Sequence, residues 1–184
     1  MNWQLVALDH AVPQPWRNGG GVTRELLTWP SASDWRVRIS VADVEEAGPF
    51  SRFAGIERWF AVLAGEGVLL DIDGAPHRVT RGGAPLRFDG DAAVECQLVA
   101  GPTRDLNLMA PPGAARMQRV EGALEIRSPA FALLALHAHD TPARVQSGGA
   151  IMEVPARHLA WCLSSTAAEI AVTGTDALWM EVRT

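Results

Sequence analysis

The stretch that decides the fold is GPFSRFAGIERWFAVLAGEGVLLDIDG, at residues 48–74. An apolar run at residues 59–63 is followed by a Gly-Glu-Gly turn and then by a second apolar run. Asp73 and Gly74 close the stretch, and both residue types tolerate positive φ, which is typical of a tight hairpin. Short apolar runs separated by turn residues predict paired β-strands rather than a helix.

The same pattern continues on both sides of this stretch. Apolar and polar residues alternate over residues 35–41, which predicts a half-buried strand. No window of about 12 residues carries a helical stripe, and we expect only a short helical turn at residues 43–47. A Pro-Pro-Gly break at residues 111–113 divides the chain into two all-β halves, 1–113 and 114–184, that we expect to share one core. In the second half, residues 170–172 and 178–182 read as separate strands.

The composition is that of an ordinary globular protein. The chain has 184 residues, of which 48% are hydrophobic and 20% charged, and its formal net charge is -5. A nucleic-acid module would show a basic stripe, whereas here the arginines are scattered and lysine is absent. Cys96 and Cys162 lie in apolar runs and are expected to be reduced and buried. The N-terminus lacks signal-peptide features, and the longest apolar run is too short to span a bilayer, so we expect a cytoplasmic protein.

Residues 48–74 resemble the first conserved segment of the cupin barrels. In metal-binding cupins this segment carries two histidines and a glutamate, but here Ser51 and Phe53 stand near the histidine positions and only Glu57 matches. The second cupin segment would begin at Gly90, and no histidine follows it before the Pro-Pro-Gly break. The resemblance implies a double-stranded β-helix of the jelly-roll type. Since the usual nitrogen and oxygen ligands are missing, we expect no metal and no cofactor.

Four segments resemble a narrower family, HutD/Ves. They are PWRNGGGVTRE at 15–25, WRVRIS at 35–40, GPFSRFAGIER at 48–58 and GPTRDLNLM at 101–109. The resemblance implies a bicupin, in which a first cupin-like half (1–113) carries the motifs and a second half (114–184) is divergent. It also implies a non-enzymatic modulator of bacterial histidine utilisation that binds an acidic intermediate such as formylglutamate or urocanate.

The predicted ligand site is built from these motifs. An arginine, Arg36 or Arg58, would hold the carboxylate of the ligand through its planar, bidentate guanidinium. Polar side chains would bond the remaining polar groups of the ligand, and aromatic residues would form apolar walls. The predicted ligand-binding residues are Trp16, Asn18, Gly19, Gly20, Thr23, Glu25, Arg36, Phe50, Ser51, Phe53, Arg58, Asp105 and Asn107.

Two other functions are compatible with the sequence. The first is a metal-independent isomerase, lyase or hydrolase that acts on an acidic metabolite, with Glu25 or Asp105 as general base. The second is a metallocupin that uses His137 and His139, which have i, i+2 spacing on a strand, although a half-exposed pair at a strand end is the simpler reading. In each case the expected partner is a small acidic metabolite, with no nucleic acid and no membrane. A homodimer is compatible with the sequence.

Overall fold

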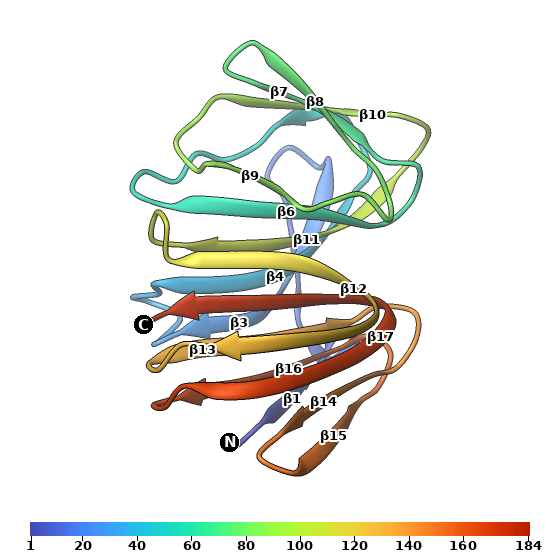
Figure 1. Ribbon diagram of the computed structural model, residues 1–184. Coiled ribbons are helices and arrows are strands. Elements are labelled where there is room, and N and C mark those ends of the chain that lie inside the picture. The colour runs from blue at the N-terminus through green and yellow to red at the C-terminus, as the bar shows by residue number, and fades with distance from the viewer. The chain divides into compact units, whose positions relative to one another are not determined.

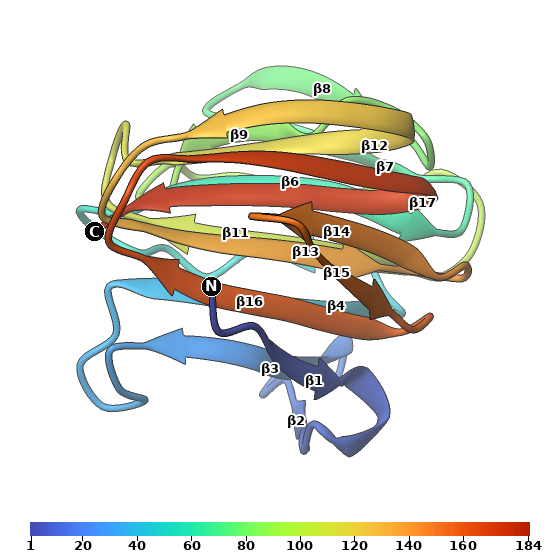
Figure 2. The same cartoon turned by 60° about the horizontal axis from the view of Figure 1, so that its bottom comes forward.

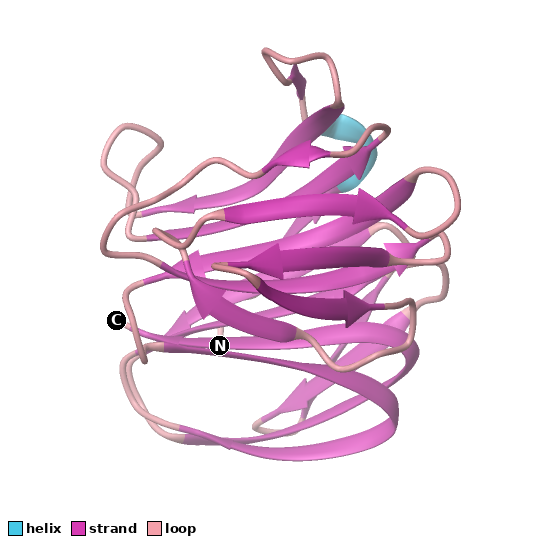
Figure 3. Cartoon of the chain, turned by 90° about the horizontal axis from the view of Figure 1, so that it is seen from above, coloured by secondary structure: helices cyan, strands magenta, loops and turns pink.

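The computed structural model describes residues 1–184 and is almost entirely β. It contains seventeen strands and a single turn of 3-10 helix, η1 (Leu8–His10), so the expected absence of long helices is confirmed (Figure 3). The short helical turn predicted at residues 43–47 is wrong. Strand β4 (Val37–Val44) runs into this segment, because its apolar residues continue the alternation of a buried strand. The structure has no helix with the length and hydropathy that crossing a bilayer requires.

The chain forms two compact units. One, called here the motif unit, comprises Val12–Gly113, and the other, called the C-terminal unit, comprises Met1–Ala11 and Ala114–Thr184. The first eleven residues therefore do not belong with the half in which the sequence placed them. Their strand β1 (Gln4–Ala7) pairs antiparallel with β16 (His158–Ser164), a partner about 150 residues away along the chain.

The motif unit consists of two antiparallel sheets (Figure 1). The larger has the order β2-β3-β4-β11-β6-β9 and the smaller β5-β10-β7-β8. Their bounds, with β4 given above, are β2 (Pro13–Pro15), β3 (Gly21–Trp29), β5 (Gly48–Pro49), β6 (Glu57–Ala64), β7 (Val68–Ile72), β8 (Ala75–Val79), β9 (Leu86–Asp89), β10 (Val94–Leu98) and β11 (Thr103–Ala110).

Alternate residues of both sheets of the motif unit form one core. The cluster takes Ala42 and Val44 from β4, Phe60 and Val62 from β6, and further buried residues from β7 to β10. This is the arrangement of two sheets packed face to face, with every second side chain directed inward. The predicted hairpin is present, because Asp73 (φ 50°) and Gly74 (φ 87°) connect β7 to β8.

The C-terminal unit consists of one seven-stranded antiparallel sheet. Figure 2 shows β13, β16 and β17 side by side, with β17 in the middle of the path β13-β17-β14. The bounds of its remaining strands are β12 (Ala115–Ser128), β13 (Ala132–Ala138), β14 (Ala143–Ser147), β15 (Ala150–Val154) and β17 (Ala168–Arg183).

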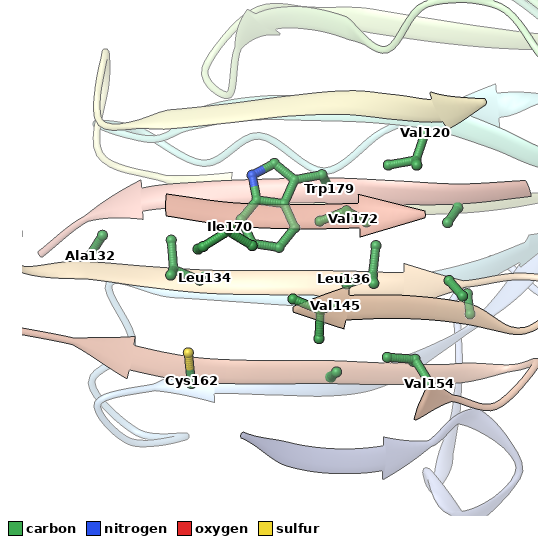
Figure 4. Close-up of a cluster of buried hydrophobic side chains, with 14 residues drawn as sticks. Val120, Ala132, Leu134, Leu136, Val145, Val154, Cys162, Ile170, Val172 and Trp179 are labelled. Atoms are coloured by element: carbon green, nitrogen blue, oxygen red, sulfur yellow. The ribbon is translucent and has the colours of Figure 1, made fainter. Parts of the chain in front are cut away.

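The core of the C-terminal unit surrounds Trp179, which is 1% exposed (Figure 4). Its neighbours are aliphatic side chains of β13, β14 and β17, together with Cys162 of β16. Residues 170–172 and 178–182, expected as two strands, belong to the single long strand β17. The strand continues past Gly174 because β12 pairs with it on both sides of a register shift between Val120 and Gly122.

Candidate functional site

A cavity of about 420 Å³ lies within the motif unit. Its floor is formed by inward-facing residues of β4, β6 and β11, and its rim by the segment around β2 and the segment that follows β5. Alternation along the strands explains which residues reach it, since every second residue of β4 faces this side. The lining residues are Gln14, Pro15, Trp16, Arg17, Asn18, Thr23, Arg38, Ser40, Ala42, Val44, Pro49, Phe50, Ser51, Phe53, Arg58, Phe60, Asn107 and Met109.

Eight of the thirteen predicted ligand-binding residues line this cavity. They are Trp16, Asn18, Thr23, Phe50, Ser51, Phe53, Arg58 and Asn107. Five do not line it: Gly19, Gly20, Glu25, Arg36 and Asp105. The structure thus brings together most of the predicted residues, although these eight come from three separate segments of the sequence, 15–25, 48–58 and 101–109.

Arg58 is the most unusual residue of the cavity. It is 6% exposed, and its Nη2 donates to Asn107 Oδ1 at 2.8 Å while its Nη1 donates to the carbonyl of Ser51 at 3.4 Å. The guanidinium also contacts two aromatic rings, with its Cζ 4.9 Å from the centroid of Phe50 and 5.2 Å from that of Phe88. Its Nε has no hydrogen-bond partner, and its protein contacts are to neutral groups only.

The charge of Arg58 is retained despite its burial. Burial lowers the pKa of Arg58 to about 10, and the positive charge of Arg38 lowers it further in the same direction. The group therefore remains protonated at neutral pH. A buried cation without a counter-ion is costly, so an anion that enters the cavity would meet a site that already favours it.

Arg38 is the second arginine on the cavity floor, and it differs from Arg58 in having a carboxylate partner. Its Nε lies 2.8 Å from Glu25 Oε1, an ion pair without the alignment of a hydrogen bond. The side chains are 15% and 30% exposed, respectively. Glu25 also accepts a hydrogen bond of 3.4 Å from Gln14 Nε2, and the Arg38 guanidinium lies 5.9 Å from the ring of Trp35.

The glycine-rich loop shapes one side of the rim. Gly21 must be glycine, because a Cβ there would lie 2.5 Å from the carbonyl oxygen of Asp43 and 3.1 Å from the ring of Trp16. That ring is oriented by its Nε1, which donates to Thr23 Oγ1 at 2.8 Å. Asn18 Oδ1 accepts from the backbone N–H of Gly20 at 3.1 Å, so the loop is held by its own side chain.

The aromatic segment after β5 forms the opposite side. The backbone N–H of Phe50 donates to Val94 at 2.9 Å and that of Phe53 to Gly90 at 2.7 Å. Phe53 also meets Trp35 edge to face, with ring centroids 6.1 Å apart. These contacts fix two aromatic walls of the cavity in place.

Asp105 and Arg36 lie away from the cavity surface for different reasons. Asp105 is fully buried within the motif unit, where its Oδ2 accepts from Thr103 Oγ1 at 3.0 Å and its Oδ1 has no partner. Burial raises the pKa of Asp105 to about 8, partly offset by the hydrogen bond from Thr103. Arg36 precedes β4 and is exposed. Two residues were considered as the general base of an enzyme. Of these, Glu25 is ion-paired with Arg38, and Asp105 is a buried acid; neither lines the cavity.

The histidine pair lies in the C-terminal unit, and it is not half-exposed as expected. His137 is 0% and His139 2% exposed, with ring centroids 6.2 Å apart. They do lie at the end of β13 (Ala132–Ala138), as expected, with His137 its penultimate residue and His139 directly after it, but this strand end is itself buried. Candidate ligand atoms of His139, Asp140 and Asp176 lie within 4.8 Å of one another.

Comparison with known proteins decides the family. The HutD family model matches residues 9–180. The chain belongs to the HutD family. A relative from Pseudomonas putida, named "Uncharacterized 21.2 kDa protein in hutC 3'region", is 37% identical over 135 residues, 71% of each chain. Protein Ves from Citrobacter koseri is 39% identical over 97 residues, 51% of this chain and 50% of that protein.

Solved structures of HutD and of cupin-like proteins share the fold. HutD from Pseudomonas fluorescens SBW25 is 30% identical, with a TM-score of 0.85 over 99% of this chain and 98% of that one. A cupin 2 conserved barrel domain protein from Leptotrichia buccalis matches 98% of this chain and 96% of its own with a TM-score of 0.56, at 9% identity, which bears on the fold alone. The predicted family and the cupin-like jelly-roll class are confirmed; the bicupin arrangement stays a prediction.

Arg38 is the main site residue that sequence reasoning missed. Arg36 and Arg38 are two residues apart, so a strand directs both side chains to the same face. The alternation alone could not tell which of the two reaches the cavity. Gln14 and Ser40 were also missed, although both follow from the register that pairs β2 with β3 and β3 with β4. The signal that could have found Arg38 is its place inside the alternating run, with buried Val37 and Ile39 on either side, whereas Arg36 precedes the strand.

Proposed function

We propose that this HutD-family protein is a non-enzymatic receptor for a small metabolite that carries a carboxylate. The observation that carries the proposal is Arg58, a guanidinium buried at a cavity wall with only neutral protein partners. A carboxylate can accept two parallel hydrogen bonds from such a group, and it gains most where water is excluded.

The size and lining of the cavity support a small ligand. Its volume of about 420 Å³ is within the range of sites that hold metabolites and drug-sized molecules. Trp16, Phe50, Phe53 and Phe60 supply apolar surface, and Asn107 supplies a polar group beside the arginine. This mixture of apolar walls and few polar groups is typical of ligand pockets.

The family name and the named neighbourhood of the Pseudomonas putida relative suggest histidine utilisation as the context. We therefore propose a cytoplasmic modulator of that pathway, with formylglutamate or urocanate as the acidic intermediate that it binds. Neither acid requires a metal or a second cofactor to be recognised by this cavity, since a guanidinium and hydrogen-bonding side chains are sufficient for a carboxylate.

Isothermal titration tests the proposal with four compounds: urocanate, N-formylglutamate, histidine and glutamate. We expect at least one of the two intermediates to bind with a Kd below about 1 mM, equivalent to about −4 kcal/mol, and more tightly than histidine. If neither does, the histidine-pathway version is wrong. Consumption of either compound by the purified protein, lost in Glu25→Gln, would instead establish an enzyme.

A further inference from the structure

Three arginines line the cavity, and they differ in solvent exposure and in whether a carboxylate neutralises their charge. Arg17 is exposed, so water and salt screen its charge. Arg38 and Arg58 are both sheltered, but only Arg38 has a carboxylate within ion-pair distance. The sheltered part of the cavity therefore offers one uncompensated positive charge, at Arg58.

Glu25 does not itself line the cavity, but it compensates the charge of Arg38 from the same face of the sheet. Its Cα pairs with that of Ser40, a lining residue, and Thr23 two residues earlier also lines the cavity. Two lining residues hold its carboxylate, Arg38 at 2.8 Å and Gln14 at 3.4 Å. A register shift between Glu25 and Leu27 ends the regular pairing just beyond this point.

We infer that the cavity selects a ligand with a single carboxylate, bound at Arg58, and a neutral far end, because Glu25 already occupies the second sheltered arginine. This inference rests on the proposed function and narrows it to a ligand class. A ligand with a second carboxylate near Arg38 would have to displace Glu25 or lie beside it. Like charges brought together in a sheltered site oppose binding.

The neutral far end has suitable partners. The side chains of Gln14, Asn18 and Ser40 reach the cavity, and they present amide and hydroxyl groups rather than charges. The aromatic rings on both sides favour a flat or unsaturated body between the two ends of the ligand. The cavity is thus matched in charge to a monoanion and in shape to a short, partly planar molecule.

Isosteric ligands that differ by one charge test this inference. N-formylglutamate carries two carboxylates, whereas N-formylglutamine and N-formylisoglutamine each replace one carboxylate with an amide of the same shape. By isothermal titration at near-physiological salt, we expect the wild-type protein to bind one of the monoamides about tenfold more tightly than the diacid, a difference of about 1.4 kcal/mol.

The Glu25→Gln variant should abolish the expected preference. Removing the carboxylate while keeping its shape frees Arg38, so the diacid should gain about tenfold in affinity and the monoamides should not. Glu153→Gln is the matched control, because Glu153 pairs with Arg144 in an exposed ion pair of the C-terminal unit. It should leave all three affinities unchanged.

The outcomes separate this inference from the proposed function. If the wild-type protein prefers the diacid over both monoamides, the inference is overturned and the proposed function stands. If it binds none of these acids and no urocanate, the proposed function fails and the inference with it. The wild-type comparison tests the preference for a single carboxylate even if Glu25→Gln does not fold. If the variant folds and keeps the wild-type preference, Glu25 is not the cause of that preference.

Discussion

At Arg58, the protein keeps a charge that its own side chains do not neutralise. The guanidinium is held by one side-chain amide, one backbone carbonyl and two aromatic rings. Desolvating a cation without a counter-ion destabilises the folded state, and residues that break a local rule in this way are expected at functional sites. A bound carboxylate would neutralise the guanidinium and so offset this unfavourable desolvation free energy.

Arg58→Met should therefore separate binding from stability. Carboxylate binding should be lost, while the free energy of unfolding of the unliganded protein should stay the same or rise by about 1–2 kcal/mol, because an unneutralised buried charge is removed. Titration and urea denaturation measure the two effects. Arg36→Gln, which alters an exposed arginine outside the cavity, is the control and should change neither. A loss of more than about 2 kcal/mol in Arg58→Met would show that the arginine is mainly structural.

Asp105 should make stability depend on pH. Its pKa is about 8 in the folded protein and ordinarily 3.8, so between these values the folded state holds a proton that the unfolded state has lost. Stability should therefore fall as pH rises through this window, by about 1.4 kcal/mol per pH unit for one proton.

Asp105→Asn should remove this dependence. The amide keeps the shape and can still accept a hydrogen bond from Thr103, but it cannot ionise. We expect the variant to be more stable than the wild type at pH 8.5 and to differ much less at pH 4.5, measured by chemical denaturation at both values. Asp34→Asn, at an exposed position, is the control. Parallel pH profiles for Asp105→Asn and the wild type would contradict the assignment.

At the scale of the elements, the turn before β10 holds the aromatic wall of the cavity. The carbonyl of Gly90 accepts from the N–H of Phe53, and its own N–H donates to the carbonyl of Ile56, both at 2.7 Å. A Cβ at this position would lie 2.6 Å from the oxygen of Ile56 and 2.8 Å from that of Phe53. Both are backbone atoms, so a substitution must move the segment itself.

Gly90→Ala should accordingly lower the free energy of unfolding by about 1–3 kcal/mol and weaken carboxylate binding, because the segment that carries Phe50 and Phe53 must shift. Urea denaturation and titration provide the measurements. Gly48→Ala is a fair comparison, since its Cβ would meet only Asn18 Nδ2, at an ordinary 3.6 Å, and φ is not positive there. Equal losses in the two variants would refute the steric argument.

For the whole molecule, ligand binding should be visible as thermal stabilisation. A ligand that binds only the folded state adds about 2.7 kcal/mol at a concentration of 100 times Kd. We expect Tm to rise with the concentration of a monocarboxylate ligand in the wild type and in Arg36→Gln, and not in Arg58→Met. Scanning fluorimetry measures this directly, and an equal rise in Arg58→Met would place the binding site elsewhere.

Much of the motif unit could be predicted from local pattern. Alternation predicted the strand that contains Val37 and Ile39, and the Asp-Gly pair predicted the β7–β8 hairpin, because both signals depend on neighbouring residues. The continuous strand β17 could not be predicted, since Gly174 looks like an interruption until β12 is known to pair across it.

The candidate site, too, could be predicted from the sequence only in part. Motifs at 15–25, 48–58 and 101–109 were enough to predict the family and eight of the cavity residues, because their residue types and order are written in the chain. Which arginine is sheltered, and which already has a carboxylate, depends on register between strands that are far apart in the sequence. Burial and charge pairing are properties of the packed fold, so the distinction between Arg36, Arg38 and Arg58 came only from the tertiary structure.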